Sequence, residues 1–320
     1  MKVYLKNIFF FLFILLLMNH VIVWFYEAPK RESIKNNTYT EKLKWDAIHN
    51  SNEKYDVIIL GSSRVYNAYN PKVIDSVLHV NSLNMGTGSQ NIIESYYLLK
   101  EIFEHQQPKF LVFDLFSRSI EYGSPDYSHI LSNADFLSTK NKSDLIVNGF
   151  GGDGIMNFTF PLLKYKTYIK NDFTNLLQKK VSKQPEKKWY KGYCEVPTII
   201  NADVVEKLVP TVKFKQKEKA IKKLDFYLKK IRDLCKENNT TLISIRTPYP
   251  PMRLEKDILG DQQLSTLFDS VAKNLQVHFY DFNYLPNEYS NFDFFDFHHM
   301  NHIGAQKASI VLSEIILKEK

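Results

Sequence analysis

Apolar residues alternate along the chain between short unbroken runs and longer runs with helical spacing. Short apolar runs bounded by glycine or polar residues are typical of strands buried on both faces of a parallel sheet. The longer runs are typical of helices that cover such a sheet, so the alternation predicts parallel βαβ units with right-handed crossovers. The predicted strands are 55–60, 80–85, 110–116, 241–247 and 277–282, and the predicted helices are 71–78, 92–105, 216–238, 261–273 and 304–318.

These elements predict one α/β domain over residues 55–320, a three-layer α/β/α sandwich of flavodoxin-like type with about five parallel strands. The alternation lapses over 117–215, which we interpret as an insertion lying over the sheet. Its glycine run at 149–154 is no dinucleotide-binding fingerprint, because no apolar strand leads into it. Its basic stretch at 179–191 is interpreted as a solvated face rather than a binding site.

Residues 8–26 form the one apolar stretch of membrane-spanning length, with Asn19 and His20 as its only strongly polar members. Lys2 and Lys6 precede it and favour a cytoplasmic amino terminus. A cleaved signal peptide is the alternative, but no small-x-small cleavage site follows the stretch.

We therefore expect an uncleaved, single-pass signal-anchor over residues 1–29. Residues 30–54 are polar and are interpreted as a stalk. The domain at 55–320 is then expected outside the cytoplasm, in a bacterial envelope.

The composition is that of an ordinary globular protein, with 44% hydrophobic and 24% charged residues among 320. The net charge of +7 suits an anionic surface such as lipid or an anionic polymer, but it is too diffuse to indicate nucleic acid. The two cysteines, Cys194 and Cys235, show no metal-ligand spacing, and a single disulfide between them stays open.

Two serines, Ser62 and Ser63, follow Gly61 directly after the first predicted strand. Ligands of open α/β sheets bind at this carboxyl edge. A serine hydroxyl becomes a nucleophile when a histidine, oriented by a carboxylate, removes its proton. The alternative is a strand-to-helix turn in which one serine caps the helix.

The loop after the fifth strand supplies such a pair, Asp296 and His299, at the same sheet edge. Phenylalanines within 292–297 would exclude water from one side of the pair. The loop has three histidines within 298–302, so a metal site and an ordinary polar helix start are alternatives. A metal site is disfavoured because no other histidine-rich segment offers further ligands.

Three blocks follow one another along the chain: Gly61-Ser62-Ser63, Asn84-x-Gly86-x-Gly88 and Asp296-x-x-His299-Met300-Asn301-x-x-Gly304. With these blocks in this order, the chain resembles the SGNH (GDSL-like) hydrolase superfamily over about 55–120 and 216–318. It most closely resembles the membrane-anchored branch that includes alginate-type O-acetyltransferases and teichoic-acid D-alanyl transfer proteins.

The resemblance implies that Ser63 is the nucleophile, with Ser62 in place of the usual aspartate. His299 would act as general base and then acid, and Asp296 would hold its tautomer. The oxyanion would be bound by backbone N–H groups, and two polar side chains would contact substrate. The expected oxyanion donors are Ser63, Gly88 and Gly86, and the expected substrate-binding residues are Arg64 and Asn84.

One block of the family pattern is missing, the asparagine that follows the third strand and donates to the oxyanion. Losing one such donor typically costs about a hundredfold in rate. Ser117 or another residue of the insertion is a candidate replacement. Arg64 would position an anionic group, although we expect an exposed arginine in a surface ion pair.

The resemblance implies ester chemistry, either an esterase or an O-acyltransferase, on an extracytoplasmic polysaccharide or cell-envelope glycopolymer. It implies no cofactor and no metal, and a multi-span membrane acyltransferase as a partner. One alternative is a catalytically weak scaffold that binds glycan or a membrane acyltransferase complex. Another is a phosphate- or nucleotide-binding module that uses the turn after the first strand.

Overall fold

A computed structural model describes residues 2–50, 52–115, 127–163, 165, 188–199, 218–286 and 289–320. About half of the predicted insertion, including most of its basic stretch, lies outside these residues. The chain divides into two compact units, and all of the candidate site residues belong to the second. The first unit is Met1–Leu43 with Asp126–Lys183, and the second is Lys44–Pro125 with Gln184–Lys320.

The second unit is built on a five-stranded sheet in the order β2-β1-β3-β6-β7, in which all neighbouring strands are parallel. This is the 2-1-3-4-5 order of flavodoxin-like folds. The predicted α/β fold is therefore confirmed. The strands are β1 (Val57–Leu60), β2 (Ser82–Asn84), β3 (Phe110–Asp114), β6 (Thr241–Arg246) and β7 (His278–Asp281).

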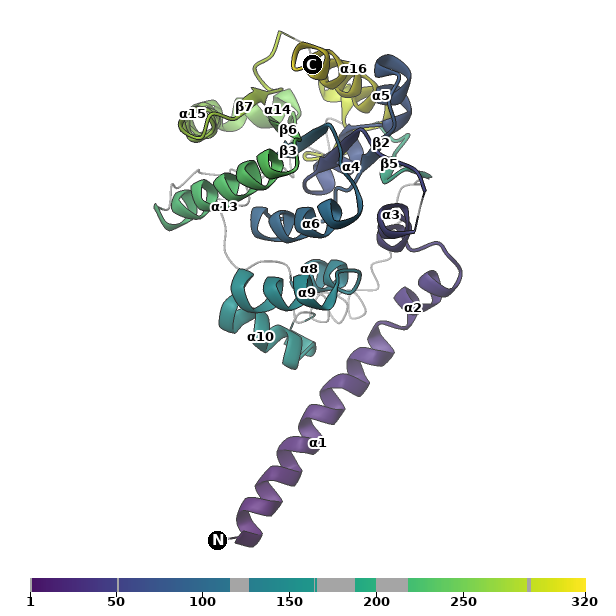
Figure 1. Ribbon diagram of the computed structural model, residues 1–320, viewed down its shortest axis with the longest axis vertical. Coiled ribbons are helices and arrows are strands. Elements are labelled where there is room, and N and C mark those ends of the chain that lie inside the picture. Colours follow the sequence, from purple (N-terminus) through teal and green to yellow (C-terminus); the bar gives the residue numbers. More distant parts are fainter. Residues whose placement is uncertain are drawn as a thin grey trace. The chain divides into compact units, whose positions relative to one another are not determined.

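Helices cover both faces of this sheet (Figure 1). On one face, Val57 and Ile59 of the wholly buried β1 join a core with residues of α4, α5 and α16. Figure 1 shows α6 and α13, which pack on each other, on the opposite side of the sheet. These helices are α4 (Ser63–Ala68), α5 (Pro71–Leu78), α6 (Ile92–His105), α13 (Glu218–Glu237) and α16 (His302–Lys318), and α15 (Ile258–Asn274) packs against β7.

The elements match the predicted ones with shifted ends. The helix α16 begins at His302 instead of 304, because the Asn301 side chain caps it and accepts the N–H groups of Ile303 and Gly304 at 2.9 and 3.1 Å. Such a cap satisfies N–H groups that have no partner within the helix.

The segment interpreted as a stalk, 30–54, contains most of α2 (Ala28–Lys35) and the whole of α3 (Thr40–His49). In the last part of α3, Trp45 and Ile48 are fully buried. Residues 44–50 therefore belong to the folded second unit, because an apolar face that is buried this way needs a packed partner.

A hairpin that the sequence reading missed lies in the described part of the insertion. It pairs β4 (Lys188–Tyr190) antiparallel with β5 (Tyr193–Glu195). Its turn residues, Lys191 and Gly192, both have positive φ, as type I′ hairpin turns require. The hairpin packs on the sheet edge, where the Asn84 N–H donates to the Lys191 carbonyl at 3.0 Å.

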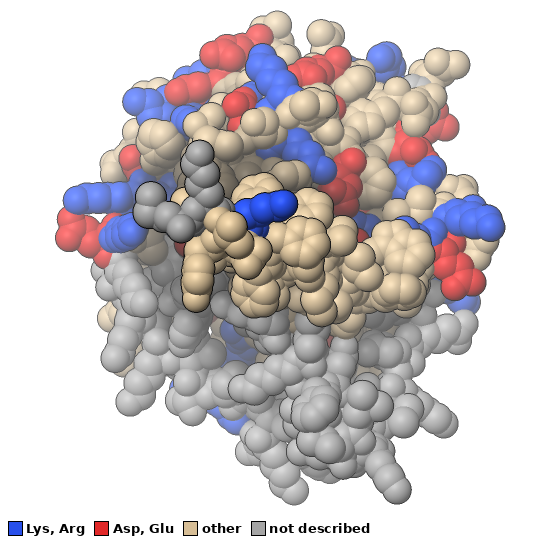
Figure 2. All heavy atoms as spheres, turned by 90° about the horizontal axis from the view of Figure 1, so that it is seen from below, with Lys and Arg blue, Asp and Glu red and all other residues tan. Residues whose placement is uncertain are grey.

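The first unit contains α1 (Lys2–Tyr26), and among the described residues α1 is the one helix long and apolar enough to cross a membrane. Nearly all of its side chains are exposed. Figure 2 shows, at the centre of the face seen from below, a group of residues other than Lys, Arg, Asp and Glu, with a Lys or Arg side chain among them. The other helices of this unit are α8 (Tyr127–Ala134), α9 (Thr139–Asp144), the π-helix η1 (Leu145–Gly149) and α10 (Gly151–Thr159).

Candidate active site

Ser63 lies where β1 turns sharply into α4. Gly61 makes the turn close, since a Cβ there would lie 2.5 Å from Val65 Cγ2 and 2.8 Å from Asp114 Cβ. Ser62 is buried and caps α4, with its Oγ accepting the Arg64 N–H at 3.3 Å. Ser63 is the partly exposed serine of the pair. Because Ser62 is buried and caps the helix, Ser63 is the serine whose hydroxyl is available at the site.

The strand order places this turn at the point where ligands bind in folds of this type. From β1 the chain goes to β2 on one side and then to β3 on the other. The crevice outside the carboxyl ends of β1 and β3 lies between these diverging connections. Ser63 follows β1 directly, so its hydroxyl lies at this crevice.

The side chains of Ser63, His299 and Asp296 form a continuous hydrogen-bond chain. Ser63 Oγ lies 2.8 Å from His299 Nε2, and His299 Nδ1 lies 2.8 Å from Asp296 Oδ2. Nδ1 donates to the carboxylate, which leaves Nε2 to accept the serine hydroxyl. This is the arrangement in which a histidine can take a proton from serine.

The loop that carries the histidine is held in shape by its own backbone. Phe294 and Met300 form an isolated antiparallel β-bridge, and the Phe295 N–H donates to the His299 carbonyl at 3.1 Å. The Phe295 ring stacks on the His299 ring with centroids 5.6 Å apart. Asn301 closes the loop, because its amide donates to the Phe292 carbonyl at 2.7 Å.

The Asp296 carboxylate is held in its ionised form. Burial acts to raise its pKa, but the hydrogen bond and charge interaction with His299, with backbone N–H donors, lower the pKa overall. Its Oδ1 accepts the N–H groups of His298 and His299 at 2.7 and 2.8 Å. The carboxylate is thus fixed in position by three hydrogen bonds and stays charged.

His298 points to a different partner, since its Nδ1 contacts Arg253 Nη1. Burial and the charge of Arg253 lower the pKa of His298 to about 2. His298 is therefore neutral and contacts Arg253, whereas His299 contacts Ser63.

The structure corrects the roles expected for Asn84 and Gly86. The Asn84 side chain is fully buried, and its amide donates to the carbonyls of Val65 and Tyr69 at 3.0 and 2.8 Å. Its Oδ1 accepts the Gly86 N–H at 3.0 Å. Asn84 thus ties β2 to α4 and does not face substrate, and the Gly86 N–H already has an acceptor.

The structure also corrects the expectation for Arg64. Its side chain is buried rather than exposed, and its guanidinium donates to the carbonyls of Thr247 and Pro248. The Tyr249 ring lies between two guanidinium groups, with Arg64 at 3.5 Å and Arg253 at 3.8 Å from its centroid. Arg64 holds the loop after β6 against α4, and it is not placed to bind an anionic substrate.

Two backbone N–H groups stay as candidates for binding an oxyanion. Ser63 is the first residue of α4, where a helix N–H has no acceptor within the helix. Gly88 lies in the partly exposed turn after β2. Ser117, the suggested replacement for the missing asparagine, lies outside the described residues.

Several residues around the site gave no signal in the sequence reading. Lys44 is buried and donates to the Gly86 carbonyl at 2.7 Å. The strand β5 packs on α4, and the His302 N–H donates to the Val196 carbonyl at 3.0 Å. The described end of the insertion therefore lies against both segments that flank the reactive pair. The Lys-Gly dipeptide between two aromatic residues was the available signal for this hairpin.

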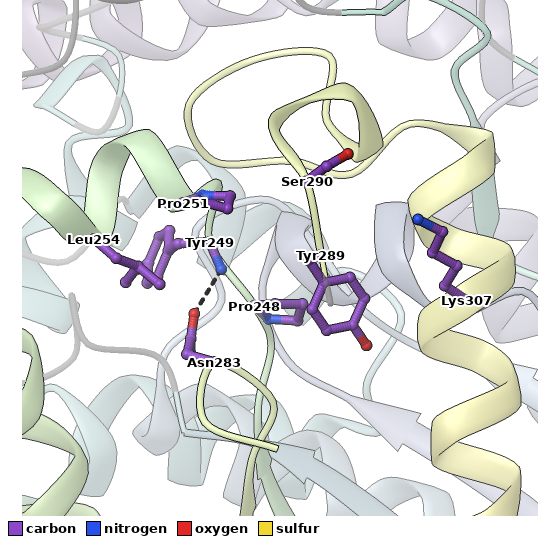
Figure 3. Close-up of a pocket in the computed structure, with 8 residues that line it drawn as sticks. All are labelled: Pro248, Tyr249, Pro251, Leu254, Asn283, Tyr289, Ser290 and Lys307. Atoms are coloured by element: carbon purple, nitrogen blue, oxygen red, sulfur yellow. Dashed lines mark hydrogen bonds between the residues drawn. The ribbon is translucent and has the colours of Figure 1, made fainter. Parts of the chain in front are cut away.

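A cavity of about 500 Å³ is lined by residues of the chain after β6, of the loop after β7 and of α16 (Figure 3). It shares Tyr249 with the cluster of Arg64 and His298, and the Tyr249 N–H donates to Asn283 Oδ1 at 2.7 Å. The aromatic and proline rings of its wall suit a flat apolar or sugar-like face. The lining residues are Pro248, Tyr249, Pro251, Leu254, Asn283, Tyr289, Ser290 and Lys307.

Comparisons with known proteins give similarity to solved structures at low identity. A protein-family model matches residues 203–320, and no curated protein matches the chain. A GDSL-like lipase from Bacteroides thetaiotaomicron is 11% identical with a TM-score of 0.41, covering 82% of this chain and 88% of its own. A lipase/acylhydrolase from Enterococcus faecalis is 11% identical with a TM-score of 0.38, covering 82% and 96%.

A third similar structure is a carbohydrate acetylesterase family member from Sinorhizobium meliloti. It is 9% identical with a TM-score of 0.38, covering 83% of this chain and 98% of that chain. These likenesses are to GDSL-like lipases, acylhydrolases and esterases. At such identities and TM-scores they carry no argument about the function of this chain.

Proposed function

We propose that this chain is a serine-dependent acyl esterase or O-acyltransferase. The observation that carries the proposal is the unbroken chain of hydrogen bonds from Ser63 through His299 to Asp296. It lies at the carboxyl edge of a parallel sheet, where an incoming ester would meet the hydroxyl.

In the proposed reaction, Ser63 Oγ attacks the acyl carbonyl carbon while its proton passes to His299 Nε2. The charged imidazole is stabilised by the ionised Asp296. The leaving alkoxide takes the proton from His299, which yields an acyl-serine and a free alcohol. Water or a sugar hydroxyl then gives a proton to His299 and attacks the acyl carbon. The bond to Ser63 Oγ breaks, and this oxygen takes the proton back from His299, which restores the free serine and releases the acid or the new ester.

During both attacks a negative charge develops on the carbonyl oxygen. We assign its stabilisation to the backbone N–H groups of Ser63 and Gly88. Two donors of this kind are each worth about a hundredfold or more in rate. The N–H of Gly86 is left out of this role because it is bound to Asn84.

We propose an extracytoplasmic glycan or glycopolymer as the acceptor and a multi-span membrane acyltransferase as the donor partner. The support is the long apolar α1, which would hold the domain at a membrane surface. The ring-lined cavity beside the site would suit a sugar.

A catalytically weak glycan-binding scaffold is the second candidate. The observation in its favour is the sequence after β3, Leu115-Phe116-Ser117-Arg118, which has no asparagine to complete the oxyanion site.

A fluorophosphonate probe distinguishes the two. The full chain in detergent is treated with the probe, and its intact mass is measured. One added probe on wild type and His298→Ala, and none on Ser63→Ala or His299→Ala, supports the enzyme. A wild type that takes no probe and cleaves no activated ester favours the scaffold.

A further inference from the structure

A second cluster of chemically capable side chains lies away from the serine, at the opposite edge of the sheet. His49 ends α3, and Glu101 and His105 occupy successive turns of α6 (Figure 1). The one ligand atom that each contributes lies within 4.8 Å of both others. We propose that His49, Glu101 and His105 form a binding site for a divalent transition-metal ion, with Zn²⁺ as the fitting ion.

The distances within the cluster fit ligands of one ion. His49 Nε2 lies 3.4 Å from Glu101 Oε1, and His105 Nε2 lies 3.6 Å from the same oxygen. Zinc bonds to imidazole nitrogen and carboxylate oxygen are about 2.0–2.2 Å long, so two tetrahedral ligands are separated by about 3.3–3.6 Å. The two measured separations fall in that range.

The His49 nitrogen is not used in another way. Its Nε2 atom is shielded from solvent and has no hydrogen-bond partner in the part of the chain that the structure describes. Its distance to Glu101 is within ion-pair range, but the pair does not have hydrogen-bond geometry. An ion between the two atoms would give the His49 nitrogen a partner.

The donor set matches the chemistry of zinc more closely than that of calcium or magnesium. Two imidazoles and one carboxylate are typical zinc ligands, whereas Ca²⁺ and Mg²⁺ take oxygen ligands. The spacing of Glu101 and His105, four residues apart on α6, places both on one face of the helix. The partly exposed His105 leaves a path for the ion and room for a water ligand.

Hydrogen bonds of Gln106, the residue after His105, hold the elements of the cluster together. The Gln106 amide donates to the Ile48 carbonyl at 3.3 Å, and its Oε1 accepts the Tyr55 N–H at 3.4 Å. Gln106 thus links the end of α3, the end of α6 and the chain entering β1. A metal ion here would lock α3, which follows the apolar helix in sequence, onto the α/β domain. It would take no part in the chemistry at Ser63, which follows the other end of β1.

Cobalt absorption tests the proposal on the full chain in detergent, after chelator treatment. Wild type should bind one equivalent of Co²⁺ with the intense visible bands of a four-coordinate site, and Zn²⁺ should displace it. His105→Ala and Glu101→Gln should weaken binding by more than about tenfold, since losing even an outer-shell partner costs about 10–100-fold.

His278→Ala is the matched control, because His278 also pairs with a glutamate, Glu319 at 2.7 Å, at a place where no third ligand was found among the described residues. It should bind Co²⁺ as wild type does. Zn²⁺ should raise the Tm of wild type and His278→Ala but not of His105→Ala. Equal Co²⁺ affinity of wild type and His105→Ala, or only the weak spectrum of hydrated Co²⁺, would overturn the site. Fluorophosphonate labelling of Ser63 should survive chelation.

Discussion

Ser63 Oγ lies 2.8 Å from His299 Nε2, although 236 positions separate the two residues in the chain. The contact depends on β1 and β7 ending at the same edge of one parallel sheet. It also depends on the loop after β7 folding back toward α4.

Ser63→Ala should lower turnover of an activated ester by about a thousandfold or more, because the nucleophile is lost. Ser62→Ala should cost only about 1 kcal/mol of stability, because Ser62 caps α4. Turnover and urea unfolding of the two variants are the measurements. Similar turnover in both variants would contradict the assignment of the nucleophile.

Asp296→Asn should lower turnover by about a hundredfold or more while leaving the fold intact, since an amide favours the wrong imidazole tautomer. Asp293→Asn is a suitable control, because Asp293 lies in the same loop and contacts Ser290 and Lys307 instead of the histidine. Steady-state kinetics on both variants test this, and an Asp293 variant as inactive as the Asp296 variant would count against it.

His298 should make stability depend on pH. Its pKa is lowered to about 2 by burial and by Arg253, whereas an unfolded histidine has a pKa of about 6.5. Between these values the unfolded chain binds a proton that the folded chain does not. The free energy of unfolding should therefore fall with decreasing pH below about 6.5, by up to about 1.4 kcal/mol per pH unit.

Urea unfolding at pH 7, 6 and 5 measures this slope above the range where carboxylates titrate. His298→Phe should flatten it, and the exposed His302→Ala should not. An unchanged slope in His298→Phe would show that the histidine is not held neutral.

Gly304→Ala should displace the histidine loop, because a Cβ there would lie 2.2 Å from the Asp293 carbonyl oxygen. We expect a loss of about 1–3 kcal/mol of stability and reduced turnover. Gly152→Ala is the matched control, since a Cβ there meets nothing within 4 Å. Equal free energies of unfolding of the two variants would show that the loop accommodates the added Cβ without loss of stability, which contradicts the prediction.

The apolar helix should stay attached to the mature protein, with the α/β domain outside the cytoplasm. The amino-terminal sequence of the purified protein should begin before residue 8. Protease added to intact and osmotically opened cells should degrade the domain once any outer layer is removed. An amino terminus after residue 26 would show that the segment is a cleaved signal.

The strands were predictable because apolar runs between polar segments report burial on both faces of a sheet. The three residues of the hydrogen-bond chain were predictable only as types at strand ends. Arg64 and Asn84 were assigned wrongly because polar residues beside a candidate nucleophile look exposed in sequence. The burial of Arg64 depends on the loop after β6, which lies far from it along the chain. The burial of Asn84 depends on its contacts with α4 and the residue that follows it. The Lys44 contact also depends on tertiary packing that leaves no local pattern.

A hydrogen bond to Asn19 of α1 indicates how far below a membrane surface part of the first unit would lie. Its side chain accepts the Leu162 N–H at 3.3 Å, and Tyr26 and Tyr165 stack with ring centroids 4.7 Å apart. Seven residues separate Asn19 from Tyr26, which is about 10 Å along a helix axis. With α1 across a bilayer and Tyr26 at its surface, Leu162 lies about 10 Å below the surface.

With α1 in a bilayer, residues 160–163, which follow α10, would lie within the lipid boundary beside α1. The exposed apolar side chains of α10, Ile155, Met156 and Phe158, would meet acyl chains rather than water. Removing residues 1–26 to obtain a soluble enzyme would therefore remove Asn19, the hydrogen-bond partner of Leu162. It would also expose the apolar side chains of α10 to water instead of lipid. Such a truncated chain should aggregate unless detergent replaces the lipid.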